Sequence, residues 1–133
     1  MKIYFDENFP YQIAKALNIL QSPKEDENVE VVNISDYFGR GAADEMWIPQ
    51  IAKLNGIVVT QDLRIQNTHH QRDLYREHKL GVVFFKPPSK KGYTYWEQVE
   101  KVILSWKEIK NTDRQKRPFA FVIRPNSKHL EPL

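Results

Sequence analysis

Short apolar runs recur along the chain, and segments with helical periodicity separate them. The runs occupy residues 3–5, 29–34, 57–60, 82–85 and 119–123. They are rich in β-branched or aromatic residues and apolar at most positions, without strict alternation with polar residues. Such runs are typical of strands buried on both faces of a parallel sheet. The pattern therefore predicts five buried strands.

Between the strands, apolar residues return at intervals of three and four, as on one face of a helix. The predicted core stripes are Ile13, Ala16, Leu17 and Leu20; Ile48, Ile51, Ala52 and Leu54; and Trp96, Val99, Val102, Ile103, Trp106 and Ile109. A polar helix is predicted over 67–79 and a loop over 35–43, and Pro49 is expected to delay the second helix until about Trp47. Strand and helix alternate throughout. This order predicts a single α/β domain over 1–133, with three α-β-α layers and a mostly parallel sheet of about five strands.

Composition narrows the environment of this domain. The absence of cysteine excludes disulfides and thiolate metal sites, and it fits a reducing, cytoplasmic compartment. No apolar run approaches the roughly 18 residues of a membrane span, so no membrane is expected as a partner. Residues 1–62 carry ten acids against five Lys or Arg, and residues 63–133 carry seven against fifteen. An acidic first half and a basic second half suit either a metal site beside a polyanion surface or a solvated basic face.

Acidic residues follow two of the predicted strands and begin a helix. Asp6 comes directly after the first strand, Asp62 after the third, and Asp44 and Glu45 stand at the start of the second helix. In a parallel sheet these positions meet at the carboxyl edge, where ligands bind. Crowded carboxylates raise one another's pKa, and a divalent cation removes that penalty. Oxygen ligands alone favour Mg²⁺ or Mn²⁺, which activates water for attack on phosphate. The alternative for each acid is a cap or turn role, strongest for Asp44.

Three segments of the first half of the chain carry short motifs, in a fixed order. The opening Met-Lys-Ile-Tyr-Phe-Asp-Glu-Asn-Phe-Pro resembles a strand followed by D-E-N-x-P. Gly41-Ala42-Ala43-Asp44-Glu45 resembles G-x-S/A-D-E, and Val58-Val59-Thr60-Gln61-Asp62 resembles V-L-V-T-x-D. In these motifs the chain resembles the PIN-like domain family, in particular its small VapC-like ribonucleases, over about residues 1–85. It implies a PIN-like fold, metal-dependent cleavage of RNA, and a role as the toxin of a type II toxin–antitoxin pair, with an antitoxin protein as partner.

The site expected from this reasoning has three parts. Asp6, Asp44 and Asp62 would bind the metal ion, Glu7 and Glu45 would assist catalysis, and Arg40, Arg64, Asn8 and Thr60 would bind the substrate. The chain departs from the family pattern at Arg64 and Ile65, where many relatives have a second acid and an aromatic residue.

Two alternatives to a nuclease stay open at this point. Arg64 in place of an acid favours a non-catalytic PIN-like module that binds RNA or a protein. A receiver-like signalling domain also has acids at its strand ends. It needs a lysine directly after a late strand, a position that Lys86 has here. A homodimer is a further expectation for any of these proteins.

Overall fold

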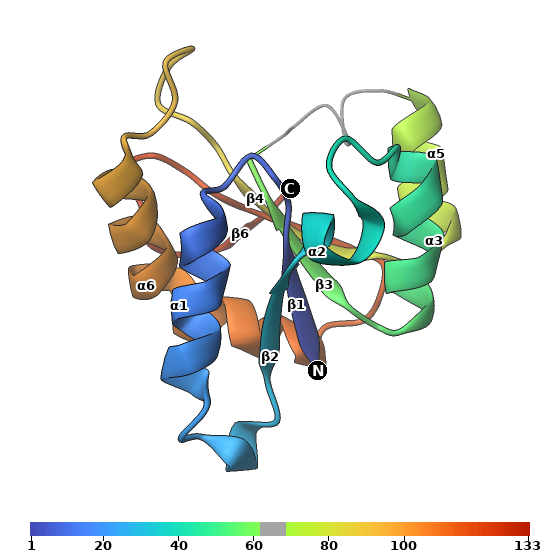
Figure 1. Ribbon diagram of the computed structural model, residues 1–133. Coiled ribbons are helices and arrows are strands. Elements are labelled where there is room, and N and C mark those ends of the chain that lie inside the picture. The colour runs from blue at the N-terminus through green and yellow to red at the C-terminus, as the bar shows by residue number, and fades with distance from the viewer. Residues whose placement is uncertain (62–68) are drawn as a thin grey trace.

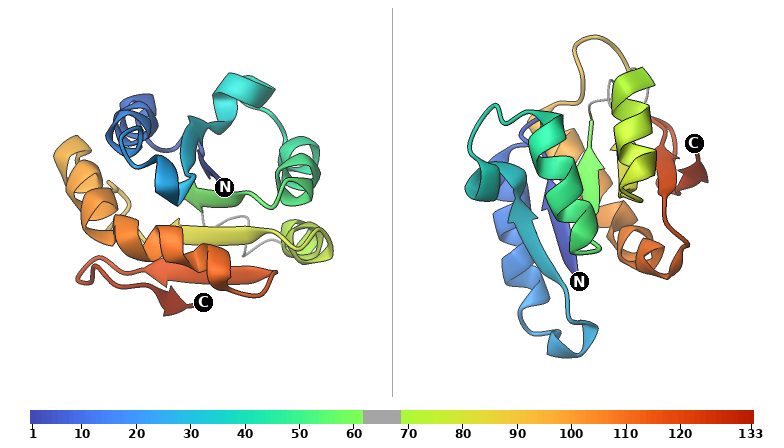
Figure 2. Two further views of the ribbon diagram at one scale, coloured as in Figure 1. Left: turned by 90° about the horizontal axis from the view of Figure 1, so that it is seen from below. Right: turned by 90° about the vertical axis from the view of Figure 1, so that its right-hand side faces the viewer.

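A six-stranded sheet forms the middle layer of the protein, between two layers of helices (Figures 1 and 2). The computed structural model describes residues 1–61 and 69–133. The strands are β1 Lys2–Phe5, β2 Glu30–Asn33, β3 Ile57–Thr60, β4 Gly81–Phe85, β5 Phe119–Ile123 and β6 Glu131–Pro132. Their order across the sheet is β2-β1-β3-β4-β5-β6. The first five are parallel, as predicted, and β6 adds an antiparallel edge strand made by the C-terminal tail.

Helices cover both faces of this sheet. They are α1 Tyr11–Gln21, α2 Ile34–Phe38, α3 Asp44–Lys53, α5 His69–Glu77 and α6 Tyr95–Asn111, with short 3₁₀ turns η1 Glu25–Glu27 and η2 Thr112–Arg114. Helices α1 and α6 lie against one face, and α3 and α5 against the other (Figure 2). None of the helices in the described ranges is long and apolar enough to cross a bilayer.

Two apolar clusters hold the layers together, one on each face. Alternate residues of each strand point to opposite faces. Accordingly Ile3 and Phe5 pack toward α1 and α6, whereas Tyr4 packs toward α3 and α5. Strands β3 and β4 are buried at every position because helices cover them on both sides. This double burial explains why the sequence shows continuous apolar runs.

The segment before α3 differs from the prediction in two respects. Residues 35–43 were expected to be a loop, but the chain enters α2 directly after β2, and Ile34 is buried as its first residue. Helix α3 begins at Asp44 although Pro49 lies inside it. The proline removes one hydrogen-bond donor. Burial of Ile48 and Ile51 on either side of it favours the helix and offsets that loss.

The predicted core stripe of α6 was wrong at two positions. Trp96 is 74% exposed and Ile103 is 53% exposed. The buried face is centred instead on Val102, Ser105 and Ile109. A polar residue such as Ser105 is not expected in a core stripe, so the predicted stripe was drawn too far round the helix. Ser105 can be buried because its hydroxyl donates to the carbonyl of Lys128 at 3.0 Å.

Candidate acidic site at the carboxyl edge of the sheet

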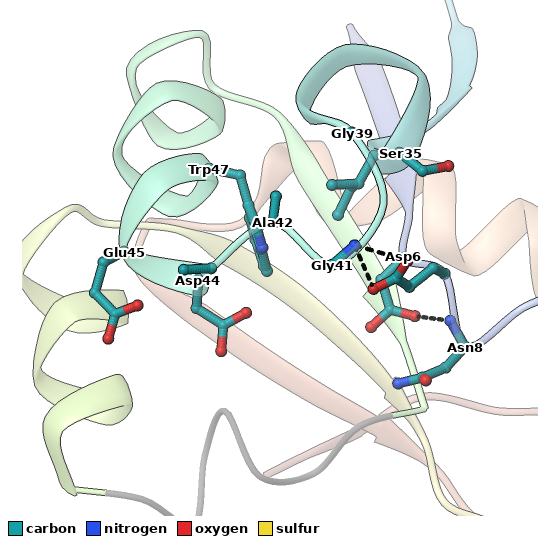
Figure 3. Close-up of a pocket in the computed structure, with 12 residues that line it drawn as sticks. Asp6, Asn8, Ser35, Gly39, Gly41, Ala42, Asp44, Glu45 and Trp47 are labelled. Carbon is teal, nitrogen blue, oxygen red and sulfur yellow. Dashed lines mark hydrogen bonds between the residues drawn. The ribbon is translucent and has the colours of Figure 1, made fainter.

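A pocket of about 350 Å³ opens at the carboxyl edge of the sheet, between the end of β1 and the segment that joins α2 to α3 (Figure 3). Its lining residues are Asp6, Glu7, Asn8, Ile34, Ser35, Gly39, Gly41, Ala42, Ala43, Asp44, Glu45 and Trp47. Four of these residues are acidic. The buried side chains of Ile34 and Trp47 supply its apolar lining. The carboxylates are thus gathered in a pocket that also has apolar lining residues.

Asp6 lies where β1 turns out of the sheet, and it is buried. Its backbone N–H donates to the carbonyl of Val59 at 3.1 Å, which continues the pairing of β1 with β3 by one residue. The carboxylate oxygen Oδ1 of Asp6 accepts a hydrogen bond from the backbone N–H of Asn8 at 2.9 Å. Its Oδ2 accepts the hydroxyl of Thr60, the last residue of β3. The first of these bonds fixes the backbone of Asp6, and the other two fix the orientation of its carboxylate before any ligand binds.

Thr60 and Asn8 were both expected to bind substrate, but only Asn8 lines the pocket. The side chain of Thr60 is fully buried and donates to the carboxylate of Asp6, so it supports Asp6 without lining the pocket itself. Asn8 is exposed and lines the pocket. Its carbonyl accepts Nε2 of Gln61 at 3.1 Å, and the same nitrogen donates to Oε1 of Gln98 in α6 at 2.8 Å. A polar link therefore connects the turn after β1 to α6.

Gln61 and Gln98 were missed by the sequence reasoning. Gln61 had a detectable signal, because it directly follows a buried strand at the edge where ligands bind. Gln98 gave no comparable signal, since it sits within a long amphipathic helix and only the packing of α6 brings it to the site.

Glu7 fastens the loop that leads into α3. Both of its carboxylate oxygens accept the backbone N–H of Gly41, at 3.2 Å each. Gly39 and Gly41 have φ angles of +80° and +72°, in the left-handed region that glycine adopts without strain. The backbone conformations of the two glycines and the hydrogen bond to Glu7 thus hold this loop at the border of the pocket. Arg40, between the two glycines, is exposed and is not among the pocket's lining residues.

Asp44 and Glu45 form the first turn of α3 and border the pocket opposite Asp6 and Asn8 (Figure 3). Ala43, not Asp44, is the capping residue, and it makes no side-chain capping bond. Carboxylates in a first turn are stabilised by the partial positive charge of the helix N-terminus. Asp44 is therefore placed by α3 as a pocket residue, and the cap role considered for it is not what the structure shows.

Asp62 and Arg64 lie outside the described residues, so their predicted roles stay predictions. Within residues 1–61 and 69–133, no three acidic or histidine side chains come close enough together to hold a metal ion. The structure thus brings Asp6, Glu7, Asp44 and Glu45 to one pocket but does not make a three-carboxylate centre from them. The oxygen donors on either side of the pocket still match the preference of Mg²⁺, which commonly uses one or two carboxylates together with waters and substrate oxygens.

A parallel α/β sheet with acids at its carboxyl edge defines a class of domain that includes several unrelated activities. Comparison with known families narrows this class. The family model described as "PIN like domain" matches residues 1–87, more than half of the chain. The protein belongs to the PIN-like domain family. Members of this family are often nucleases. The receiver-like alternative, whose strand order β2-β1-β3-β4-β5 this sheet shares, gains no support from that match.

One curated protein shows a partial likeness. The tryptophan synthase alpha chain of Methanococcus vannielii is 27% identical over 82 residues, which make up 59% of this chain and 31% of that protein. The chain therefore spans about a third of the length of the curated relative it matches. No solved structure matches the chain.

Proposed function

We propose that the protein is an Mg²⁺- or Mn²⁺-dependent endoribonuclease whose centre is the acidic pocket. The observation that carries this proposal is that Asp6 and Asp44, from segments nearly forty residues apart, line the same pocket at the carboxyl edge of the sheet. Both lie in segments that resemble PIN-like motifs. Membership of the PIN-like family adds support, because members of this family are often nucleases.

In this proposal Asp6 and Asp44 bind the metal ion, and Asp62 supplies a third carboxylate. The pocket residues fit such an ion, since their side-chain donors are carboxylate, amide and hydroxyl oxygens. A bound Mg²⁺ or Mn²⁺ would supply a Lewis acid that makes a water molecule nucleophilic near neutral pH. Thr60 and the backbone of Asn8 hold Asp6 in one orientation, so the ligand does not have to organise it.

The remaining acids of the pocket have separate roles. Glu7 keeps the loop around Gly41 over the pocket and acts as a positioning residue. Glu45 borders the pocket beside Asp44, and we assign to it the orientation or deprotonation of the attacking water. RNA would be held by phosphate contacts from Arg40, Arg64 and the basic second half of the chain.

A non-catalytic PIN-like module that binds RNA or a protein is the second candidate. It is favoured by the finding that the described part of the chain supplies no group of three acidic or histidine ligands. A toxin role is a more specific version of the endoribonuclease proposal. It predicts growth arrest on expression of the wild-type chain but not of Asp6→Asn, with relief by a co-expressed antitoxin.

Incubation of the pure protein with mixed RNAs and Mn²⁺ separates the two candidates. Asp6→Asn and Asp44→Asn are expected to abolish cleavage and to weaken Mn²⁺ binding measured by calorimetry. Asp26→Asn is the matched control, because Asp26 is an exposed residue of η1 that does not line the pocket and forms an ion pair with Lys24 at 3.7 Å. Cleavage that all three variants retain would refute the assignment of this pocket as the catalytic centre. RNA binding without cleavage would favour the non-catalytic module.

A further inference from the structure

Two aromatic side chains at the start of α6 are exposed to solvent. Trp96 is 74% exposed and Tyr95 is 42% exposed, and their rings meet edge to face with centroids 5.2 Å apart. Trp96 belongs to neither of the two apolar clusters, so the packing of the fold does not account for it. Its indole ring is therefore available to a ligand.

A small apolar groove of about 210 Å³ lies between α1 and α6, and Trp96 is one of the residues that line it. Pockets that bind drug-sized molecules have about 300–1,000 Å³, so this groove fits a smaller group. A nucleobase is such a group, with two flat faces for stacking and a polar edge. The amide of Gln12, which also lines the groove, offers both a donor and an acceptor to that edge.

The loop between β4 and α6 places positive charge directly before these aromatic residues. Residues 86–94 include Lys86, Lys90 and Lys91 and contain no acid. All three lysines are exposed, and none forms an ion pair in the part of the chain that the structure describes. The next acid, Glu97, accepts the backbone N–H of Thr94 at 2.8 Å in the helix cap. The loop is therefore suited to a negatively charged ligand such as a chain of phosphates.

Hydrogen bonds connect the start of α6 to the acidic pocket. Both lie at the same end of the sheet (Figure 1). Gln98, two residues after Trp96, donates to the carbonyl of Tyr93 at 3.2 Å and accepts Nε2 of Gln61 at 2.8 Å. Gln61 also donates to the carbonyl of Asn8, which lines the acidic pocket. A strand held at the start of α6 would thus lie at a set distance from the carboxylates.

We propose that the groove between α1 and α6 is a subsite for one unpaired nucleobase of an RNA strand. The base stacks on Trp96, Gln12 contacts its edge, and Lys90 and Lys91 bind the adjoining phosphates. Stacking on aromatic side chains beside cations that follow the backbone is how proteins hold single strands. This inference rests on the proposed function, because the acidic pocket is where the same strand would be cut.

The subsite would give the protein a selectivity that the acidic pocket alone does not supply. A base in a duplex is already stacked on its neighbours and cannot enter the groove, so unpaired RNA is preferred. The lysines favour this occupant over an apolar helix, which would need no positive charge beside the groove. The stacked base would also fix the position of the cut relative to itself.

Fluorescence anisotropy with a short labelled RNA that has no secondary structure tests the subsite, in EDTA so that no metal-dependent cleavage occurs. Trp96→Ala should weaken binding about 5- to 150-fold, which corresponds to the roughly 1–3 kcal/mol of one stacked base. Trp96→Phe keeps an aromatic ring and should recover most of the affinity. Leu104→Ala is the matched control, because Leu104 is 54% exposed on the same helix but does not line the groove.

Two further measurements separate base stacking from phosphate binding. Annealing the RNA to its complement removes the unpaired bases, so Trp96→Ala should not change the affinity for the duplex. The double variant Lys90→Gln/Lys91→Gln should reduce the slope of log affinity against log salt by about 1.4, since each phosphate contact on a single strand contributes about 0.7.

The proposal is overturned if the wild-type chain does not bind the single strand or if Trp96→Ala binds it as the wild type does. Equal losses in Trp96→Ala and Leu104→Ala, or equal losses for single strand and duplex, would also overturn it. Cleavage with Mn²⁺ is scored separately. A chain that binds through Trp96 but cuts no RNA would refute the endoribonuclease and leave the subsite standing. A chain that cuts RNA equally well with Trp96→Ala, at unchanged affinity, would refute the subsite alone.

Discussion

Replacing Thr60 by Val tests whether the hydrogen bond from Thr60 holds Asp6 in place before any ligand binds. Val has almost the same shape as Thr, so the packing at the end of β3 is kept and only the hydroxyl is lost. That hydroxyl donates to the buried carboxylate of Asp6. A hydrogen bond to a charged group contributes about 1.5–3 kcal/mol. The free energy of unfolding of the variant should fall by about that amount.

The expected change in melting temperature follows from the size of the chain. An unfolding entropy of about 2.1 cal/mol/K per residue gives about 0.28 kcal/mol/K for 133 residues. The loss therefore corresponds to a decrease of about 5–11 °C, measurable by calorimetry, with urea denaturation as a second method. Thr112→Val is the matched control. Thr112 is also buried, but its hydroxyl donates to the neutral carbonyl of Ile109 at 2.7 Å, so its loss should cost only about 0.5–1.5 kcal/mol.

A double-mutant cycle shows whether the effect belongs to the contact between Thr60 and Asp6. Thr60→Val and Asp6→Asn should be non-additive, because each variant removes the same charged hydrogen bond. Strictly additive losses, or a Thr60→Val loss no larger than that of Thr112→Val, would refute the reasoning. In either case Asp6 would owe its orientation to other contacts, and Thr60 would have no part in preparing the site.

Three further predictions concern the surroundings of the site and the stability of the fold. Gly41→Ala should destabilise the loop over the pocket by about 1 kcal/mol, because φ at this position is +72°, and it should weaken Mn²⁺ binding in calorimetry; unchanged binding would separate the loop from the site. Gln98→Leu removes the side-chain acceptor of Gln61 and should lower RNA cleavage while leaving the free energy of unfolding within about 1 kcal/mol of the wild type; full activity would show that the link is dispensable. The hydrogen bond from Lys110, followed by that from Gln21, lowers the pKa of Glu27 below its ordinary 4.5. A lowered carboxyl pKa contributes stability above about pH 4.5, and this stability is lost as the pH falls through the folded-state pKa. Lys110→Met should therefore reduce the fall in melting temperature measured between pH 6 and pH 3. An unchanged fall would show that Lys110 does not lower the pKa of Glu27.

The strands and the order of the acidic motifs were readable from the sequence because they depend on local chemistry. Five apolar runs became five parallel strands, since only residues buried on both faces can be apolar at nearly every position. Asp6 and Asp44 could be placed at one edge of the sheet by topology alone, and the pocket contains both. Where Glu7 would bind could not be predicted, because its partner Gly41 is 34 residues away in the sequence.

Tertiary structure decided what local patterns leave open, namely which neighbour each residue meets. Trp96 looked like a core residue by its spacing, but the docking of α6 buries Val102, Ser105 and Ile109 and leaves Trp96 in solvent. The tail gave no strand signal, and Glu131–Pro132 pairs with β5 only because that edge offers unpaired backbone groups. Apolar periodicity determines that a segment is amphipathic. The packing of whole elements determines which of its faces is buried, and therefore which side chains line the pocket or face the solvent.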